Sequence, residues 1–339
     1  MSSALETLTS DQRERVEAAV LATFGSAPVQ WLGAVPGGVT TARPLRIAVG
    51  GCSYLVRVEG TPSPLRNPSQ YLAMQSAAAA GIAPRVHYVD EANRVAISDF
   101  IDQRPLHLFP GGPTGLVKAL AQVIRTLQGQ STFPDFVQYP DIIGRLFAHV
   151  RRTGLFAPGI LDQHTEHFER MREAYFTGPP TLLASHNDCI PSNILFDGTR
   201  LWLIDWESAY RNDPLVDVAV TFDTLARSPE LQSLFFHEWL GREADPELWS
   251  RLDIVQSLTR LYYAGVFLSG SAAAEWRTAP ECDVTAPSVA QFHQAICSGQ
   301  LIPGTPETKH ILGKMFLSSF LSGALPPGFD AATAPPQNS

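Results

Sequence analysis

One stretch of the chain, residues 185–207, constrains the fold more than any other: SHNDCIPSNILFDGTRLWLIDWE. Two short apolar runs, NILF and LWLID, flank DGTR, and this pattern is typical of a tight β-hairpin. Because a hairpin brings its two ends together, we expect Asn193 at its start to lie beside Asp205 at its end. Asp188 stands in the loop that leads in, so the sequence predicts three oxygen-bearing side chains at one spot.

These side chains suit a hard cation and a proton acceptor. Carboxylate and amide oxygens are ligands for Mg²⁺, which completes its shell with substrate phosphates, so Asn193 and Asp205 are the expected metal ligands. Asp188 is then left to accept the proton of an attacking hydroxyl group. A hairpin that only caps the fold has no use for such groups, since each buried, unpaired polar group costs about 1 to 3 kcal/mol.

The order of these residues resembles that of a known family. His186, Asp188 and Asn193, with Asp205 after a hairpin, follow the spacing of the protein-kinase catalytic loop and metal-binding aspartate. HNDCIPSN followed by IDWE is more similar to the aminoglycoside phosphotransferase and choline kinase superfamily, closest to its choline/ethanolamine kinase-like branch, over roughly residues 30–320. The resemblance implies an ATP- and Mg²⁺-dependent kinase for the hydroxyl of a small molecule. It makes Asp188 the catalytic base and His186 a support for the loop.

Two more acidic residues gain expected roles from the same likeness. Glu207 would reach the metal through water or orient the substrate. Asp217, in DPLVDVAV, matches an aspartate that braces the catalytic loop in the family, although an acidic residue near a helix start can also be a simple cap.

The rest of the chain divides into regions of different pattern. Residues 26–103 carry short apolar strands, Gly turns and one helix, which predicts a small antiparallel sheet of five strands. Residues 104–323 are mostly helical. With the resemblance, this predicts an α+β, protein-kinase-like fold with a nucleotide-binding N-terminal lobe and a larger catalytic C-terminal lobe. A helical arm is expected over residues 1–25, and the Ala- and Pro-rich residues 324–339 are expected to be a disordered tail.

The N-terminal lobe is expected to hold the nucleotide. Gly37 and Gly38, in GGVTTA, can approach phosphate oxygens closely, although two glycines in a hairpin are more often just a turn. The segment ISDFIDQRP resembles the hinge between kinase lobes, where backbone groups of Asp99, Phe100 and Ile101 would hold adenine.

One arginine and its partner complete the expected nucleotide site. Arg57, in LVRVEG, stands on the strand where a kinase keeps its phosphate-binding lysine, and a guanidinium can grip phosphate through two hydrogen bonds. The following helix has Gln70 where the family usually has Glu. Gln cannot form an ion pair, so either Glu59 or another acid compensates, or Arg57 is held less firmly.

Composition and charge bound the partners. The formal net charge of −8 argues against nucleic acid or an anionic membrane as the main partner. The sequence has no apolar run of about 18 residues, which a membrane span needs, and no basic start followed by an apolar stretch, which a secretory signal needs. We therefore expect a cytoplasmic protein. The four cysteines are widely spaced, which favours reduced thiols. A small or cationic ligand fits best, and the sequence does not indicate the oligomeric state.

The acceptor alcohol is expected in the helical lobe. Aromatic side chains that can form a box around an ammonium group are Trp206, Tyr262, Tyr263, Phe267 and Trp276, although aromatics at helical spacing are more often core. Negative charge for a cation can come from Asp135, Glu207 and Asp213. Choline or ethanolamine is the preferred acceptor, and an aminoglycoside or sugar-like alcohol is the rival within the family.

Two other classes stay open. His186, Asp188 and Asp205 can belong to a metal-dependent hydrolase, although such sites usually gather several histidines and bridging carboxylates around two metals. A nucleotide-binding pseudokinase is favoured by Gln70 and disfavoured by the intact set of Asp188, Asn193 and Asp205.

Overall fold

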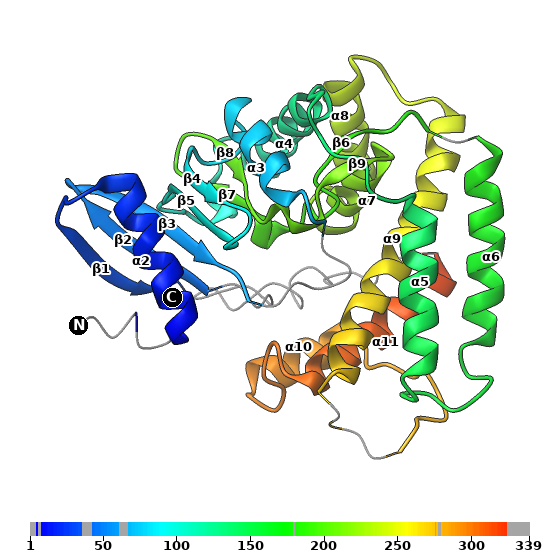
Figure 1. Cartoon of the computed structure of the whole chain (residues 1–339). Coiled ribbons are helices and arrows are strands. Elements are labelled where there is room, and N and C mark those ends of the chain that lie inside the picture. Colours follow the sequence, from blue (N-terminus) through cyan, green and yellow to red (C-terminus); the bar gives the residue numbers. More distant parts are fainter. Residues whose placement is uncertain are drawn as a thin grey trace.

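The computed structural model describes residues 5, 8–35, 43–60, 67–178, 180–274, 276 and 279–323. Within these ranges the predicted α+β class is confirmed, because a five-stranded antiparallel sheet stands beside a larger, mostly helical part (Figure 1). Gly37, Gly38 and the predicted tail lie outside the described residues. None of the helices in these ranges combines the length and the apolar character that crossing a membrane requires.

The sheet has the strand order β1-β2-β3-β5-β4. Its strands are β1 (Val29–Ala34), β2 (Arg43–Val49), β3 (Cys52–Val58), β4 (Val86–Asp90) and β5 (Val95–Asp99). Gly50 and Gly51 join β2 to β3 with φ values of 59° and 83°, so this two-residue turn needs glycine at both positions.

Helix α2 (Ser10–Phe24) covers one face of this sheet (Figure 1). It begins with a capping box between Thr9 and Gln12. Val16 is fully buried in the same core cluster as Val56, on the strand β3. Since side chains alternate along a strand, Arg57 points to the opposite face of the sheet. The apolar packing under α2 thus aims this arginine at the rest of the molecule.

Helices form most of the remainder. They are α3 (Gln70–Ala79), α4 (Gly112–Gln128), α5 (Tyr139–Arg152), α6 (Asp162–Thr177), α7 (Leu215–Thr224), α8 (Pro229–Leu240), α9 (Pro246–Ala272), α10 (Val289–Cys297) and α11 (Pro306–Ser322). The long helix α9 packs against α5, α6, α7 and α11. Gly313 permits the close approach of α11 to α9, because a Cβ atom there would lie 2.5 Å from Leu268 Cγ.

The predicted hairpin is confirmed. Strand β7 (Ile194–Phe196) pairs antiparallel with β8 (Leu201–Leu203), and Ile194 faces Leu203 in the register. The side chains of Ile194, Phe196 and Leu203 are buried in the main core cluster. A second short pair, β6 (Leu183–Ser185) with β9 (Tyr210–Asn212), lies just before and just after this segment along the chain. The hairpin is therefore fixed by its own apolar residues.

Candidate active site

The loop 186–193 leaves β6 and is held by one buried carboxylate. Asp217, in the first turn of α7, accepts backbone N–H groups from His186 at 3.0 Å and from Asn187 at 2.7 Å. Asn187 has a left-handed backbone with φ of 64°, and its side chain donates to Ser208 O at 2.8 Å. The structure thus places Asp217 as a brace of the loop, and adds Asn187, which the sequence did not single out.

His186 ties this loop to the end of the hairpin. Its ring is fully buried, its Nε2 lies 2.8 Å from the Ile204 carbonyl oxygen, and its centroid lies 4.6 Å from that of Trp206. Because a carbonyl only accepts, Nε2 carries the proton. Burial lowers the pKa of His186 to about 4. The imidazole is therefore neutral near pH 7, and its hydrogen bond joins the loop to the end of the hairpin.

Asp188 is held by a hydrogen bond on each carboxylate oxygen. Tyr263 donates its hydroxyl to Oδ1 at 2.7 Å, and Asn193 donates Nδ2 to Oδ2 at 2.8 Å. Burial raises the pKa of Asp188 to about 7, with further increases from the charges of Asp205 and Glu207 and a decrease from the Tyr263 bond. A carboxylate whose pKa lies near 7 and whose orientation is fixed has the properties of a general base.

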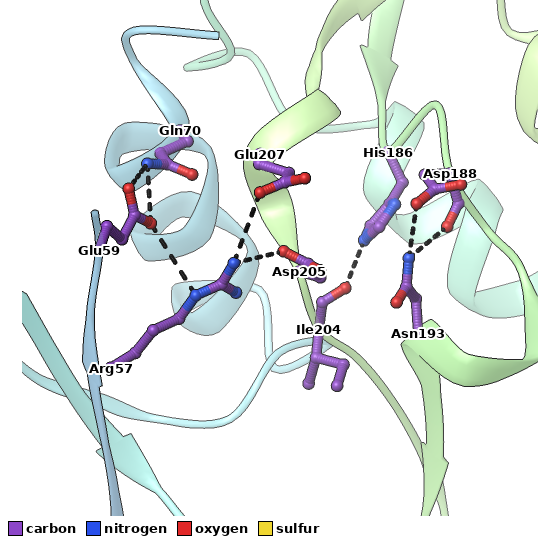
Figure 2. A network of polar contacts seen from close by, with 9 residues as sticks. All are labelled: Arg57, Glu59, Gln70, His186, Asp188, Asn193, Ile204, Asp205 and Glu207. Atoms are coloured by element: carbon purple, nitrogen blue, oxygen red, sulfur yellow. Dashed lines mark hydrogen bonds and ion pairs between the residues drawn. The ribbon is translucent and has the colours of Figure 1, made fainter. Parts of the chain in front are cut away.

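Asn193 and Asp205 come together as the hairpin spacing predicted. The backbone N–H of Ile204 bonds to the Asn193 carbonyl at 3.0 Å, so the two ligand candidates stand on adjacent strand ends. The amide nitrogen of Asn193 is engaged by Asp188, which leaves its oxygen pointing away from Asp188 (Figure 2). Asp205 has a left-handed backbone with φ of 65° and ψ of 68°, a strain that such sites commonly carry. An amide oxygen beside a carboxylate fits Mg²⁺.

No group of three or more His, Cys, Asp or Glu side chains gathers as a metal site in the part of the chain that the structure describes. Asn193 and Asp205 offer two of the six oxygens that Mg²⁺ prefers. A site of this kind is completed by water and by the phosphates of a substrate.

Arg57 joins the sheet to this cluster (Figure 2). Its NH2 group lies 2.7 Å from Asp205 Oδ1 and 3.6 Å from Glu207 Oε2, and its Nε lies 3.9 Å from Glu59 Oε1. Burial alone would lower the pKa of Arg57, but the Asp205 carboxylate raises it above its ordinary value. Gln70, the first residue of α3, donates its amide nitrogen Nε2 to both carboxylate oxygens of Glu59.

The predicted hinge residues begin with Asp99, the last residue of β5, and are half-buried. The backbone N–H of Asp99 bonds to Arg85 O at 2.9 Å, and that of Phe100 bonds to Ser53 O at 3.2 Å. Ile101 comes next in the chain. The guanidinium of Arg46 lies 4.1 Å from the centre of the Phe100 ring, so β2 also supports this segment. Adenine binding by the three residues stays a prediction.

The predicted aromatic set divides between neighbouring groups. Tyr262 and Tyr263 contact each other, with ring centres 5.6 Å apart, and Phe267 joins them through Phe316. Trp206 packs on His186 instead. A separate ring contact links Trp276 with His310 at 5.7 Å.

Two of the acids expected to attract a cation are already paired with arginines. Asp213 is fully buried and lies 2.8 Å from Arg251, so the charge expected there for a cation is already paired in the folded chain. Asp135 is exposed and lies 3.5 Å from Arg211. Glu207 is the one of the three expected acids that stands at the predicted metal site.

A profile of the phosphotransferase enzyme family matches residues 32–254, more than half of the chain. The chain belongs to this family. The match confirms the predicted family and, with it, an enzyme of the phosphotransferase class. The matched range contains Arg57, the hinge residues, the loop 186–193 and the hairpin.

Several solved kinases have the same fold. A choline/ethanolamine kinase family protein from Mesorhizobium loti is similar with a TM-score of 0.64 at 20% identity, over 94% of this chain and 96% of that one. Choline kinase LicA from Streptococcus pneumoniae has a TM-score of 0.62 at 13% identity, over 91% and 100%. Spectinomycin phosphotransferase APH(9)-Ia, with ADP and spectinomycin, has a TM-score of 0.55 at 11% identity, over 92% and 98%. These likenesses confirm the predicted protein-kinase-like fold.

Curated relatives match over short stretches. Protein LicA of Haemophilus influenzae is 44% identical over 45 residues, which are 13% of this chain and 17% of that protein. An uncharacterized protein of Metamycoplasma hominis is 40% identical over 55 residues, 16% of this chain and 11% of that protein. The matched stretches thus span less than a fifth of the length of either relative.

Proposed function

We propose that this protein is a kinase that transfers the γ-phosphoryl group of ATP to the hydroxyl of a small amino alcohol such as choline or ethanolamine. The observation that carries the proposal is the state of Asp188, which Tyr263 and Asn193 hold at both oxygens beside the predicted metal ligand Asp205. Such an arrangement orients a base and a charge-neutralising group toward one reacting centre.

The residues of the chain divide the work as follows. Asp188 accepts the proton as the hydroxyl oxygen attacks the γ-phosphorus, and the bond from that phosphorus to the bridging oxygen breaks to release ADP. Asn193 and Asp205, with Glu207 through water, would hold Mg²⁺, which neutralises phosphate charge when bound. Arg57 presents its guanidinium to the phosphates. His186 joins the loop to Ile204, the residue before Asp205.

Nucleotide binding is supported by the relatives of known structure. LicA has been solved with AMP, and the spectinomycin phosphotransferase with ADP. In this chain the predicted nucleotide site includes Asp99, Phe100 and Ile101 at the end of β5, where Phe100 contacts β2 and β3.

The acceptor class is supported by two independent likenesses. One short curated match is to Protein LicA, and the similar structures include proteins described as choline or ethanolamine kinases. The helical part adds half-buried rings of Tyr262 and Tyr263, and Tyr263 directly touches Asp188. Aromatic faces bind ammonium groups, with each contact worth about 0.5 to 2 kcal/mol. Aminoglycosides are the alternative acceptors, since their phosphotransferases share the fold.

The test is ATP consumption with Mg²⁺ against choline, ethanolamine, aminoglycosides and small sugars. Asp188→Asn keeps the shape of the side chain and removes its basicity, so we expect turnover to fall by about 10²- to 10⁴-fold. Asp162→Asn makes the same change at the exposed start of α6, where the carboxylate only pairs with Arg151 at 3.2 Å, and it should leave turnover unchanged.

Each outcome assigns the reaction differently. Turnover of an amino alcohol that Asp188→Asn abolishes supports the proposal. Turnover of an aminoglycoside alone replaces the acceptor but keeps the mechanism. Equal turnover by Asp188→Asn and the parent protein would remove Asp188 as the base.

A further inference from the structure

Three carboxylates surround the guanidinium of Arg57, and they come from two different parts of the molecule. Asp205 and Glu207 follow the hairpin, whereas Glu59 lies two residues after Arg57 just beyond the end of β3. Residues two apart on an extended strand share a face. Glu59 therefore moves with the same sheet as Arg57, and the other two acids do not.

Glu59 is itself fixed by a matched partner. Its side chain is 3% exposed, and Gln70 donates one amide nitrogen to both of its oxygens, at 3.0 Å and 2.8 Å. Gln70 is buried at the start of α3. A carboxylate only accepts hydrogen bonds, so the amide at position 70 suits Glu59. Glutamate at position 70 would instead place two carboxylates about 3 Å apart, where like charges repel strongly.

The atom of Arg57 that faces Glu59 is the one with a hydrogen bond still to make. Arg57 Nε is buried and has no hydrogen-bond partner within the described ranges, and it stands 3.9 Å from Glu59 Oε1. A shift of about 1 Å would bring the pair to the length of a charge-assisted hydrogen bond. The NH2 group, in contrast, is already bonded to Asp205 at 2.7 Å.

We infer that Glu59, oriented by Gln70, is the positioning residue that holds Arg57 toward the nucleotide phosphates. This inference rests on the proposed function, in which Asp205 serves the metal. An aspartate that binds a cation attracts Arg57 less, so the guanidinium needs a carboxylate that stays on its own sheet. Glu59 is that carboxylate, and Gln70 is its amide partner.

The test exchanges the two side chains. Glu59→Gln and Gln70→Glu are made singly and together, and the dissociation constants for Mg²⁺·ATP and for adenosine are measured by calorimetry alongside the unfolding temperature. We expect each single variant to weaken Mg²⁺·ATP binding by about tenfold or more. Glu59→Gln removes the carboxylate that anchors Arg57, and Gln70→Glu adds a second carboxylate that repels Glu59. The double variant restores one acid and one amide and should bind within about threefold of the parent protein.

Adenosine separates positioning from general damage. It has no phosphate for Arg57 to contact, so its dissociation constant should stay unchanged in all three variants. Equal losses for adenosine and ATP would assign Glu59 a structural role only. Parent-like ATP binding by Glu59→Gln, or a double variant no better than the weaker single one, would overturn the inference.

A further variant covers the case in which Glu59→Gln does not fold. Gln70→Met removes the amide at similar volume and keeps Glu59, and we expect a smaller loss, about three- to tenfold, in ATP affinity alone. All these measurements need no acceptor alcohol. The proposed function fails if Asp188→Asn keeps full turnover, and the inference fails if the exchange of positions 59 and 70 leaves ATP affinity untouched, so the two failures are distinct.

Discussion

Tyr263→Phe is the substitution that most directly tests how the base is held. It removes one hydroxyl oxygen, which lies 2.7 Å from Asp188 Oδ1, and leaves the ring that packs on Phe316 at 5.4 Å. A hydrogen bond to a charged group contributes about 1.5 to 3 kcal/mol. If that contribution serves to orient Asp188 during phosphoryl transfer, kcat should fall by about 10- to 150-fold, since about 1.4 kcal/mol corresponds to a factor of ten.

The assay is steady-state turnover of ATP with the acceptor that the panel identifies. Tyr139→Phe is the matched control, because Tyr139 is also buried near this site and its hydroxyl has no hydrogen-bond partner among the described residues. We expect that control to keep kcat within about twofold of the parent protein. A Tyr263→Phe enzyme with unchanged kcat would refute the orienting role. A faster one would show that the hydroxyl competes with the acceptor for Asp188.

Two more predictions concern stability. Burial lowers the pKa of His164 to about 4 from the ordinary 6.5, so the unfolded chain binds this proton first as the pH falls and stability is lost between those values. The free energy of unfolding should drop by about 3 kcal/mol from pH 7 to pH 4 on this account, and His164→Phe should flatten that part of a urea-denaturation pH series. Gly313→Ala places a Cβ atom 2.5 Å from Leu268 Cγ and should destabilise the α9 and α11 contact by about 1 to 3 kcal/mol in chemical denaturation. Gly129→Ala, where the nearest contact would be an ordinary 3.5 Å, should change stability by less than about 0.5 kcal/mol; no pH effect at His164 or equal losses for both glycines would contradict these arguments.

The sequence predicted the hairpin between Asn193 and Asp205 because the needed information is local. Asn193 and Asp205 are separated by one hairpin, and the apolar runs on both sides of DGTR determine where that hairpin turns. Strand alternation likewise places Arg57 opposite the face that α2 covers. In both cases a short-range pattern determines which side chains share a side.

The contacts that the sequence did not predict join residues far apart in the chain. Tyr263 reaches Asp188 across 75 positions, from the middle of a helix whose aromatic pattern reads equally well as core packing. Asp213 was expected to supply charge for a cation, but its partner Arg251 is 38 positions away and neutralises it inside the fold. Chain spacing alone carries no signal for such pairs.

The arrangement of charge at the site explains why Arg57 contacts both its own sheet and the hairpin. Burial raises the pKa of Asp188, and repulsion from the charges of Asp205 and Glu207 raises it further. Arg57 offsets part of that repulsion by bonding Asp205, and this bond joins the N-terminal sheet to the hairpin. A cation bound at Asp205 would neutralise that carboxylate in place of Arg57, and Arg57 would keep its contact with Glu59. Glu59 is then the carboxylate that still holds Arg57. The exchange of residues 59 and 70 should therefore weaken the binding of a phosphate-bearing ligand and leave the binding of a nucleoside unchanged.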